Sequence, residues 1–208
     1  HKTTKEGLKA DVIWDMKMDA PYMVFKGTQL KGKSLGILGY GSIGRRVGHI
    51  ARAFGMQLLI YDPYQGEVDI EEIGIRKVNT VEELMKESDF ITCHMKVTPE
   101  TTGIISKERI ALMKPTAYFI NASRGAILDE EALIEALREK RIAGAAFDVY
   151  ASEPIASNHP YVTELDNVVI TPHIAGATND VLVNHTKQIV SDVRRFLNGE
   201  HLLYQYRY

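Results

Sequence analysis

The sequence Gly-Tyr-Gly-Ser-Ile-Gly at residues 39–44 constrains the fold of this chain more than any other segment. It matches the pattern Gly-x-Gly-x-x-Gly, which carries little information alone because glycine is common. Here it directly follows an apolar run at residues 34–38 and opens an amphipathic stretch at residues 43–54. A strand, a glycine turn and a helix in this order are typical of a βα unit that binds a dinucleotide.

Each glycine would have its own physical task in such a loop. Gly39 would permit the tight turn, Gly41 would let the backbone approach a pyrophosphate, and Gly44 would let the helix pack closely on the strand. The N-terminus of the helix would add amide donors and a favourable dipole for the anion.

Asp62 follows the next apolar run, 18 residues after Gly44. A carboxylate near this distance accepts hydrogen bonds from a ribose hydroxyl and repels a 2′-phosphate, so the sequence predicts NAD rather than NADP as the cofactor. The alternative is a purely structural glycine turn with a solvated aspartate nearby. The combination of strand, turn, helix and acid favours the cofactor site.

Short apolar runs alternate with amphipathic stretches along the chain. The runs are apolar throughout, as expected for strands buried on both faces of a sheet. This alternation predicts an α/β fold, a doubly wound Rossmann domain with a mainly parallel sheet and helices on both faces. The predicted strands are 34–38, 57–61, 90–94, 117–120, 143–149 and 168–171, and the predicted helices are 43–54, 81–86, 107–113, 130–140 and 179–197.

Two helices carry further signals. The helix at 43–54 places Ile43, Val47, Ile50, Ala51 and Phe54 near one face. The helix at 130–140 follows an aspartate, residue 129, that would be a good N-cap. The chain as a whole divides into a helical segment at 1–30, the dinucleotide-binding domain at 31–178, and a C-terminal helix and tail at 179–208.

The composition excludes several classes of protein. The net charge of the 208 residues is −2, so no global field favours nucleic acid or an anionic membrane. No apolar run approaches the length of a membrane span. The single cysteine, Cys93, excludes an internal disulfide and a thiolate-rich metal site, and the seven histidines form no metal-binding pair at helical spacing. We therefore expect a cytoplasmic protein without a metal.

Polar side chains follow three of the predicted strands, and in open α/β sheets ligands bind beyond these carboxyl ends. Arg124 could grip a carboxylate by two hydrogen bonds and polarise a neighbouring carbonyl. His173 could transfer a proton near neutral pH. Glu153 could hydrogen-bond this imidazole, orient it and favour its charged form. Taken singly, Arg124 could belong to a surface ion pair, Glu153 could be a solvated acid and His173 could be a capping residue. Their common placement beside a dinucleotide site favours a catalytic role.

Two other residues near strand ends have simpler interpretations. His94 is interpreted as a residue of the cleft wall rather than a catalyst, and Cys93 as a buried apolar residue.

Four motifs give the chain, from about Gly32 to Asn198, a resemblance to the D-isomer-specific 2-hydroxyacid dehydrogenase family. They lie at residues 35–44, 121–125, 146–154 and 172–178. The resemblance implies hydride transfer between NAD and C2 of a small 2-hydroxy or 2-keto acid. Arg124 would then bind substrate, His173 would act as acid/base and Glu153 would support it. The predicted cofactor contacts are Gly39, Gly41, Ser42, Ile43, Gly44, Asp62, Met95, Ala122, Ser123, Asp148 and Gly176, with Asp148 facing the nicotinamide carboxamide.

Two departures from the family pattern matter. Relatives usually carry an additional N-terminal substrate lobe, so we expect this chain to be the cofactor domain of a longer protein, or a truncated form, with its C-terminal helix and tail returning toward that lobe. Lys96 stands where relatives usually carry proline, beside the expected nicotinamide position. By resemblance we also expect a homodimer that pairs through residues 5–27.

The sequence leaves the substrate and two competing interpretations open. Phosphoglycerate, glycerate, glyoxylate and lactate-type acids all fit the motifs. The alternative is a non-catalytic NAD(H)-binding or sensing module, like co-repressor relatives, or a cofactor-domain fragment that is inactive without its lobe. Such a module would retain residues 39–44 and Asp62, and the intact Arg124, Glu153 and His173 argue for an enzyme.

Overall fold

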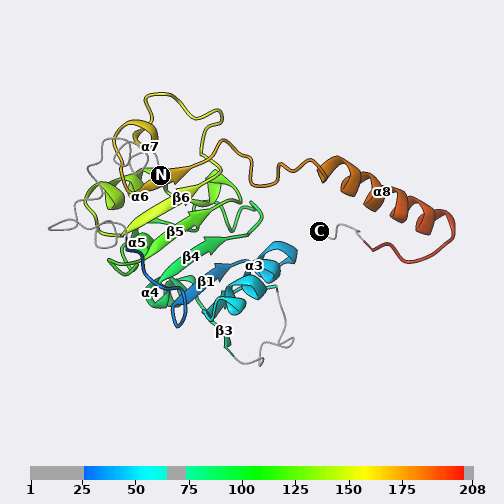
Figure 1. Cartoon of the computed structure of the whole chain (residues 1–208), viewed down its shortest axis with the longest axis horizontal. Helices are drawn as coiled ribbons and strands as arrows, with labels where there is room; N and C mark the ends of the chain where they lie inside the picture. Colours follow the sequence, from blue (N-terminus) through cyan, green and yellow to red (C-terminus); the bar gives the residue numbers. More distant parts are fainter. Residues whose placement is uncertain (1–25, 65–73, 204–208) are drawn as a thin grey trace.

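The structure is a computed structural model that describes residues 26–64 and 74–203 of the chain. Its centre is a seven-stranded sheet in the order β3-β2-β1-β4-β5-β6-β7, and every neighbouring pair is parallel (Figure 1). The order reverses between β1 and β4, which makes the sheet doubly wound, as predicted. The strands are β1 (Ser34–Leu38), β2 (Gln57–Tyr61), β3 (Ile75–Lys77), β4 (Phe90–Cys93), β5 (Tyr118–Asn121), β6 (Gly144–Phe147) and β7 (Val168–Ile170).

Helices follow most strands and cover the two faces of the sheet. The central strand β1 alternates between them, because Leu35 and Ile37 pack in the cluster beneath α3 whereas Leu38 packs in the cluster beneath α4 and α6. The helices are α3 (Ser42–Ala53), α4 (Val81–Glu87), α5 (Lys107–Ile110), the 3₁₀ turn η1 (Gly125–Ile127), α6 (Glu130–Arg138), α7 (Pro160–Thr163) and α8 (Val181–Leu197).

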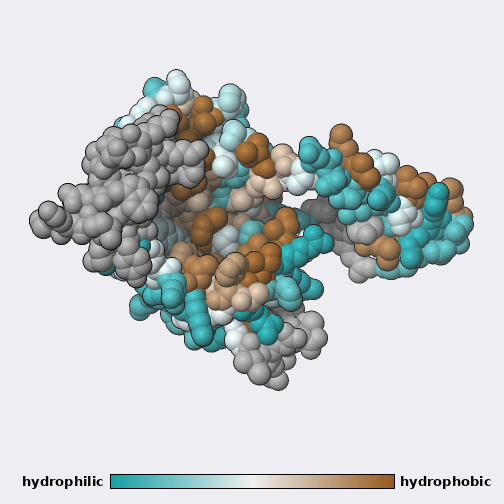
Figure 2. All heavy atoms as spheres, viewed as in Figure 1, coloured by the Kyte–Doolittle hydropathy of each residue, from teal (hydrophilic) through white to brown (hydrophobic). Residues whose placement is uncertain are grey.

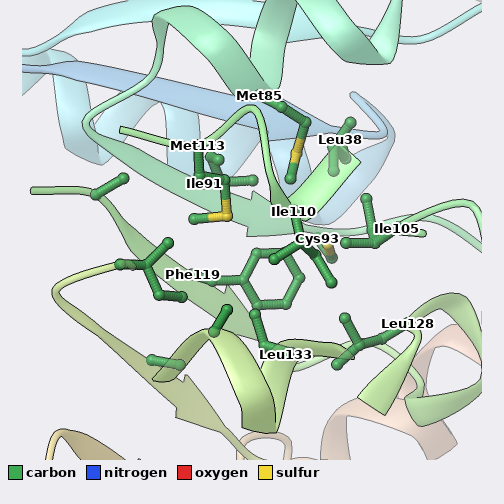
Figure 3. Packing of buried hydrophobic residues seen from close by; sticks show 14 of the residues in the cluster. Leu38, Met85, Ile91, Cys93, Ile105, Ile110, Met113, Phe119, Leu128 and Leu133 are labelled. Atoms are coloured by element: carbon green, nitrogen blue, oxygen red, sulfur yellow. The ribbon is translucent and has the colours of Figure 1, made fainter. Parts of the chain in front are cut away.

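The larger hydrophobic cluster surrounds Phe119 of β5. Figure 3 shows its ring among side chains from β4, α5 and α6, including Cys93, Ile110 and Leu133. Cys93 is completely buried there, as predicted, and burial raises the pKa of its thiol. This packing fixes β4, β5 and β6 relative to one another, and therefore fixes the loops at their carboxyl ends.

Differences from the predicted elements are local. β4 ends one residue before His94, and β6 ends at Phe147 instead of 149. The short edge strand β3, the turn η1 and the four-residue α7 were not predicted. The Asp129 side chain caps α6 as predicted by accepting the backbone N–H of Ala132 at 3.0 Å.

Only Val47 and Ala51 of the predicted apolar stripe of α3 pack on the sheet. The buried residues of this helix are Gly44, Gly48 and Ala51, whereas Ile43 and Phe54 are 62% and 59% exposed. Small residues form most of the packing face because the start of the helix lies very close to the glycine loop. A Cβ at Gly44 would lie 2.2 Å from the Gly39 carbonyl oxygen. The rest of the stripe, Ile43, Ile50 and Phe54, exposes apolar surface.

The C-terminal helix α8 stands away from the sheet at the end of an extended segment (Figure 1). None of its residues is buried, and apolar side chains including Leu182, Ile189 and Phe196 are exposed along it (Figure 2). Among the helices of residues 26–64 and 74–203, none combines the length and apolarity needed to cross a membrane.

Candidate active site

The glycine loop forms a cradle at the N-terminus of α3 that fits a dinucleotide phosphate. Gly39 has a φ of +89°, and a Cβ there would lie 2.9 Å from the backbone of His94. Gly41 is the N-cap of α3, makes no side-chain capping bond, and has open space where a Cβ would project. The first-turn amides of Ser42 and Ile43 therefore face no side-chain cap, which is the arrangement that binds phosphate oxygens.

Asp62 connects this loop to the end of β2. Asp62 is only 8% exposed, and its carboxylate accepts the backbone N–H of Tyr40 at 2.8 Å and that of Tyr64 at 2.9 Å. The predicted ribose-binding acid thus lies beside the glycine loop and also holds the loop in place. Since a carboxylate oxygen has two acceptor positions, these bonds leave capacity for a hydroxyl donor.

Arg124 lies in a short loop after β5 that is organised from inside by a buried side chain. Asn121 donates through Nδ2 to the Arg124 carbonyl oxygen at 2.9 Å, and its Oδ1 accepts the Ser123 N–H at 3.0 Å. The Ser123 hydroxyl donates to the Met95 carbonyl oxygen at 3.2 Å, which ties this loop to the one after β4. The predicted residues Met95 and Ser123 are therefore neighbours. Sequence reasoning missed the role of Asn121, although an asparagine at a loop start is a known turn signal because its side chain bonds the backbone two residues on.

Glu153 and His173 form the hydrogen bond that the sequence predicted, with Glu153 Oε2 and His173 Nδ1 2.7 Å apart. The hydrogen bond from His173 lowers the pKa of Glu153, with smaller contributions from the Tyr150 N–H and the nearby charge of Arg124. Arg124 follows the carboxyl end of β5 at the same edge of the sheet, and its Nη1 donates to the Ser123 carbonyl oxygen at 2.6 Å. His173 has a φ of +53°, an uncommon conformation for a non-glycine residue that is often found at functional sites.

Asp148 holds the loop that carries His173. Its Oδ1 accepts the Ile174 N–H at 2.8 Å and the Thr171 hydroxyl, and its Oδ2 accepts the Ala175 N–H at 2.8 Å. Burial alone would raise the pKa of Asp148, but these hydrogen bonds outweigh it and keep the pKa below its ordinary value. The contact between Asp148 and the nicotinamide stays a prediction, whereas the structure shows that this carboxylate holds the histidine loop.

The remaining predicted residues are less constrained. Ala122 and Gly176 are exposed at the same edge of the sheet, and nothing lies within 4 Å of a Cβ placed on Gly176. His94 is largely buried, hydrogen-bonds Thr92 Oγ1 through Nε2 at 3.0 Å, and has its pKa lowered by burial. These properties agree with a wall residue. Within the part of the chain that the structure describes, no group of three His, Cys, Asp or Glu side chains could hold a metal ion.

Comparison with known proteins identifies the type of domain. A family model described as the D-isomer specific 2-hydroxyacid dehydrogenase, NAD binding domain, matches residues 8–175. A D-3-phosphoglycerate dehydrogenase of Methanocaldococcus jannaschii is 43% identical over 187 residues, which are 90% of this chain and 34% of that protein. A glyoxylate reductase of Thermococcus litoralis is 40% identical over 195 residues, which are 94% of this chain and 56% of that protein.

A solved structure is similar over nearly the whole chain. An acyclic imino acid reductase in complex with NADPH and D-Arg superposes with a TM-score of 0.80 at 29% identity, covering 96% of this chain and 60% of that one. The present chain thus spans between a third and just over half of the two curated relatives.

Proposed function

Because the chain belongs to the D-isomer-specific 2-hydroxyacid dehydrogenase family and carries its NAD-binding domain, we propose that it transfers hydride between NAD and C2 of a small 2-hydroxy or 2-keto acid. The observation that carries this proposal is the 2.7 Å contact between Glu153 and His173 at the sheet edge where Arg124 also follows the end of β5. The names of the two relatives, a phosphoglycerate dehydrogenase and a glyoxylate reductase, support this substrate class.

Each side chain has a defined part in the proposed reaction. Bound nicotinamide supplies or accepts the hydride. Glu153 engages Nδ1 of His173, which leaves Nε2 as the nitrogen that gives a proton to the keto oxygen or takes one from the hydroxyl. Arg124 holds the substrate carboxylate and stabilises the charge that develops on the reacting oxygen. Glu153 orients the imidazole and favours its charged form.

The test uses the full-length protein with NADH and glyoxylate, hydroxypyruvate or pyruvate. His173→Ala should lower kcat by about 10²-fold to 10⁴-fold, the usual contribution of a general acid, while the Kd for NADH stays unchanged. His49→Ala, at an exposed position on α3, is the control and should retain activity. Binding of NADH without turnover of any 2-keto acid would favour the non-catalytic sensing module instead.

NAD is our proposed cofactor in preference to NADP. The support is the negative charge of Asp62 beside the glycine loop, where it would repel a 2′-phosphate. The solved relative with NADPH makes this preference worth measuring directly.

We also propose that the protein forms a homodimer. The predicted segment at 5–27 lies outside the described residues except for its last two positions. Support comes instead from α3, where the stripe of Ile43, Ile50 and Phe54 exposes apolar surface along one side of the helix. Light scattering that detects only monomer at micromolar concentration would refute the dimer.

The exposed apolar face of α8 fits the proposal that this helix returns to a substrate lobe. An amphipathic helix with no buried residue needs a surface to cover it. Such a lobe would complete the substrate pocket and set the choice of acid.

A further inference from the structure

Tyr150, in the loop after β6, contacts all three loops that carry the proposed catalytic side chains. These are the arginine loop at residues 121–125, the glutamate loop at 148–154 and the histidine loop at 171–176. Tyr150 is 6% exposed and its hydroxyl is engaged, so it cannot meet a substrate directly. Any contribution it makes to the reaction must pass through its neighbours.

Within the glutamate loop, Tyr150 holds the carboxylate. Its backbone N–H donates to Glu153 Oε1 at 3.1 Å, while Glu153 Oε2 contacts His173. The two oxygens thus have different partners, and this fixes the plane of the carboxylate toward the imidazole.

On the side of the histidine loop, the Tyr150 hydroxyl donates to the Thr171 carbonyl oxygen at 2.8 Å. Thr171 lies two residues before His173, and its own N–H donates to the Phe147 carbonyl oxygen at 2.9 Å. Burial, followed by the charge of Asp148, raises the pKa of Tyr150, so the hydroxyl remains a donor throughout the neutral range.

On the side of the arginine loop, the backbones themselves touch. A Cβ placed on Gly125 would lie 2.1 Å from the carbonyl carbon and oxygen of Tyr150. Only glycine permits this approach, and Gly125 directly follows Arg124. The distance between the arginine and glutamate loops is therefore set by a backbone contact with Tyr150.

We infer that Tyr150 is a positioning residue that fixes Arg124, Glu153 and His173 relative to one another. The inference rests on the proposed function, since it assigns these three side chains to one reaction. It adds a residue whose hydroxyl tunes the rate without contacting substrate or cofactor.

The test compares Tyr150→Phe with a matched control, Tyr161→Phe. Tyr161 is also buried, at 3% exposure, and stacks on Phe147 with ring centroids 4.4 Å apart. Its hydroxyl has no hydrogen-bond partner in the described structure, so the two variants lose the same atom but only one loses a bond. Tyr150→Phe should lower kcat about threefold to tenfold, in line with one hydrogen bond, and leave the Kd for NADH unchanged. Tyr161→Phe should retain kcat within about twofold of the wild type.

A second measurement does not depend on turnover. The ¹⁵N chemical shifts of the His173 ring report its hydrogen bond to Glu153, and they should change in Tyr150→Phe but not in Tyr161→Phe. If the shifts respond in this way and the wild type reduces no 2-keto acid, the positioning role stands and the proposed function fails. If the wild type is active and both variants match it in kcat and in ring shifts, the positioning role is refuted.

Gly125→Ala tests the backbone contact separately. The added methyl group must push the arginine loop from the glutamate loop, so KM for the keto acid should rise more than tenfold. NADH titration establishes that the variant is folded. A folded Gly125→Ala protein with wild-type KM and kcat would overturn the inference for this loop.

Discussion

Alanine substitutions at Gly44 and Gly41 should separate the two tasks of the glycine loop. At Gly44 the new Cβ would lie 2.2 Å from the backbone oxygen of Gly39, and backbone cannot yield as a flexible side chain can. Overpacking of this kind typically costs about 1–3 kcal/mol, against a gain of about 1 kcal/mol from the higher helix propensity of alanine. Because a backbone oxygen is the obstacle, we expect a net loss near the upper end, about 2 kcal/mol. For a chain of this size that lowers Tm by roughly 4–8 °C.

At Gly41 the opposite result is expected. Its φ of −77° suits alanine and nothing lies within 4 Å of the new Cβ. Alanine is a poorer N-cap than glycine, but it reduces the entropy of the unfolded chain, and these effects of about 0.5–1 kcal/mol offset each other. Stability should stay unchanged. The methyl group, however, would occupy the space into which a pyrophosphate must come, and Kd for NADH should rise about tenfold or more.

Thermal unfolding by circular dichroism and NADH fluorescence titration measure the two effects. The reasoning about close packing fails if Gly44→Ala melts at the wild-type temperature. The assignment of the phosphate position fails if Gly41→Ala binds NADH as tightly as the wild type does.

Three further predictions concern the charged residues of the site. Glu153→Gln should lower kcat about tenfold or more at unchanged Kd for NADH, and equal losses in both would show a general collapse of the site. Asp62→Asn should reduce the preference for NADH over NADPH by about tenfold, because one unit charge near a 2′-phosphate is removed, and titration with both cofactors measures it. Asp148→Asn should destabilise the domain by about 1.5–3 kcal/mol at pH 7, the usual worth of a hydrogen bond to a charged group. The pKa of Asp148 is lowered in the folded state, so the wild type should be more stable than the variant at pH values above the unfolded pKa of about 3.9. This difference in stability should disappear as the pH falls through the folded pKa. A difference that persists in acid would contradict the role of the carboxylate.

The central strands could be predicted from the sequence because they are continuous apolar runs with clear turn signals at their ends. β1 and β2 begin and end at the predicted residues. β3 escaped prediction because it is a three-residue edge strand with Arg76 and Lys77 in it, and a partly exposed edge needs no apolar pattern. The four-residue α7 is too short for helical periodicity to develop.

The proximity of Glu153 and His173 was predictable for a different reason. Parallel strands bring their carboxyl ends to one edge, so residues far apart in sequence meet there. Tyr150 and Gly125 could not be found this way, because their roles depend on backbone contacts between loops that no periodicity encodes. The packing face of α3 was obscured because glycines, which carry no hydrophobic signal, form its closest contact.

The placement of His173 in the loop that follows β7 has a consequence for its motion. β7 contains three residues and is bonded to the sheet through β6 alone among the described strands, so it should open by local unfolding well before the core does. The bonds from Asp148 to the amides of Ile174 and Ala175 oppose that opening from the other end of the loop. Hydrogen exchange at those two amides would then report how often the His173 loop opens. A slow rate there would mean that a single buried carboxylate holds this loop more firmly than β7 does.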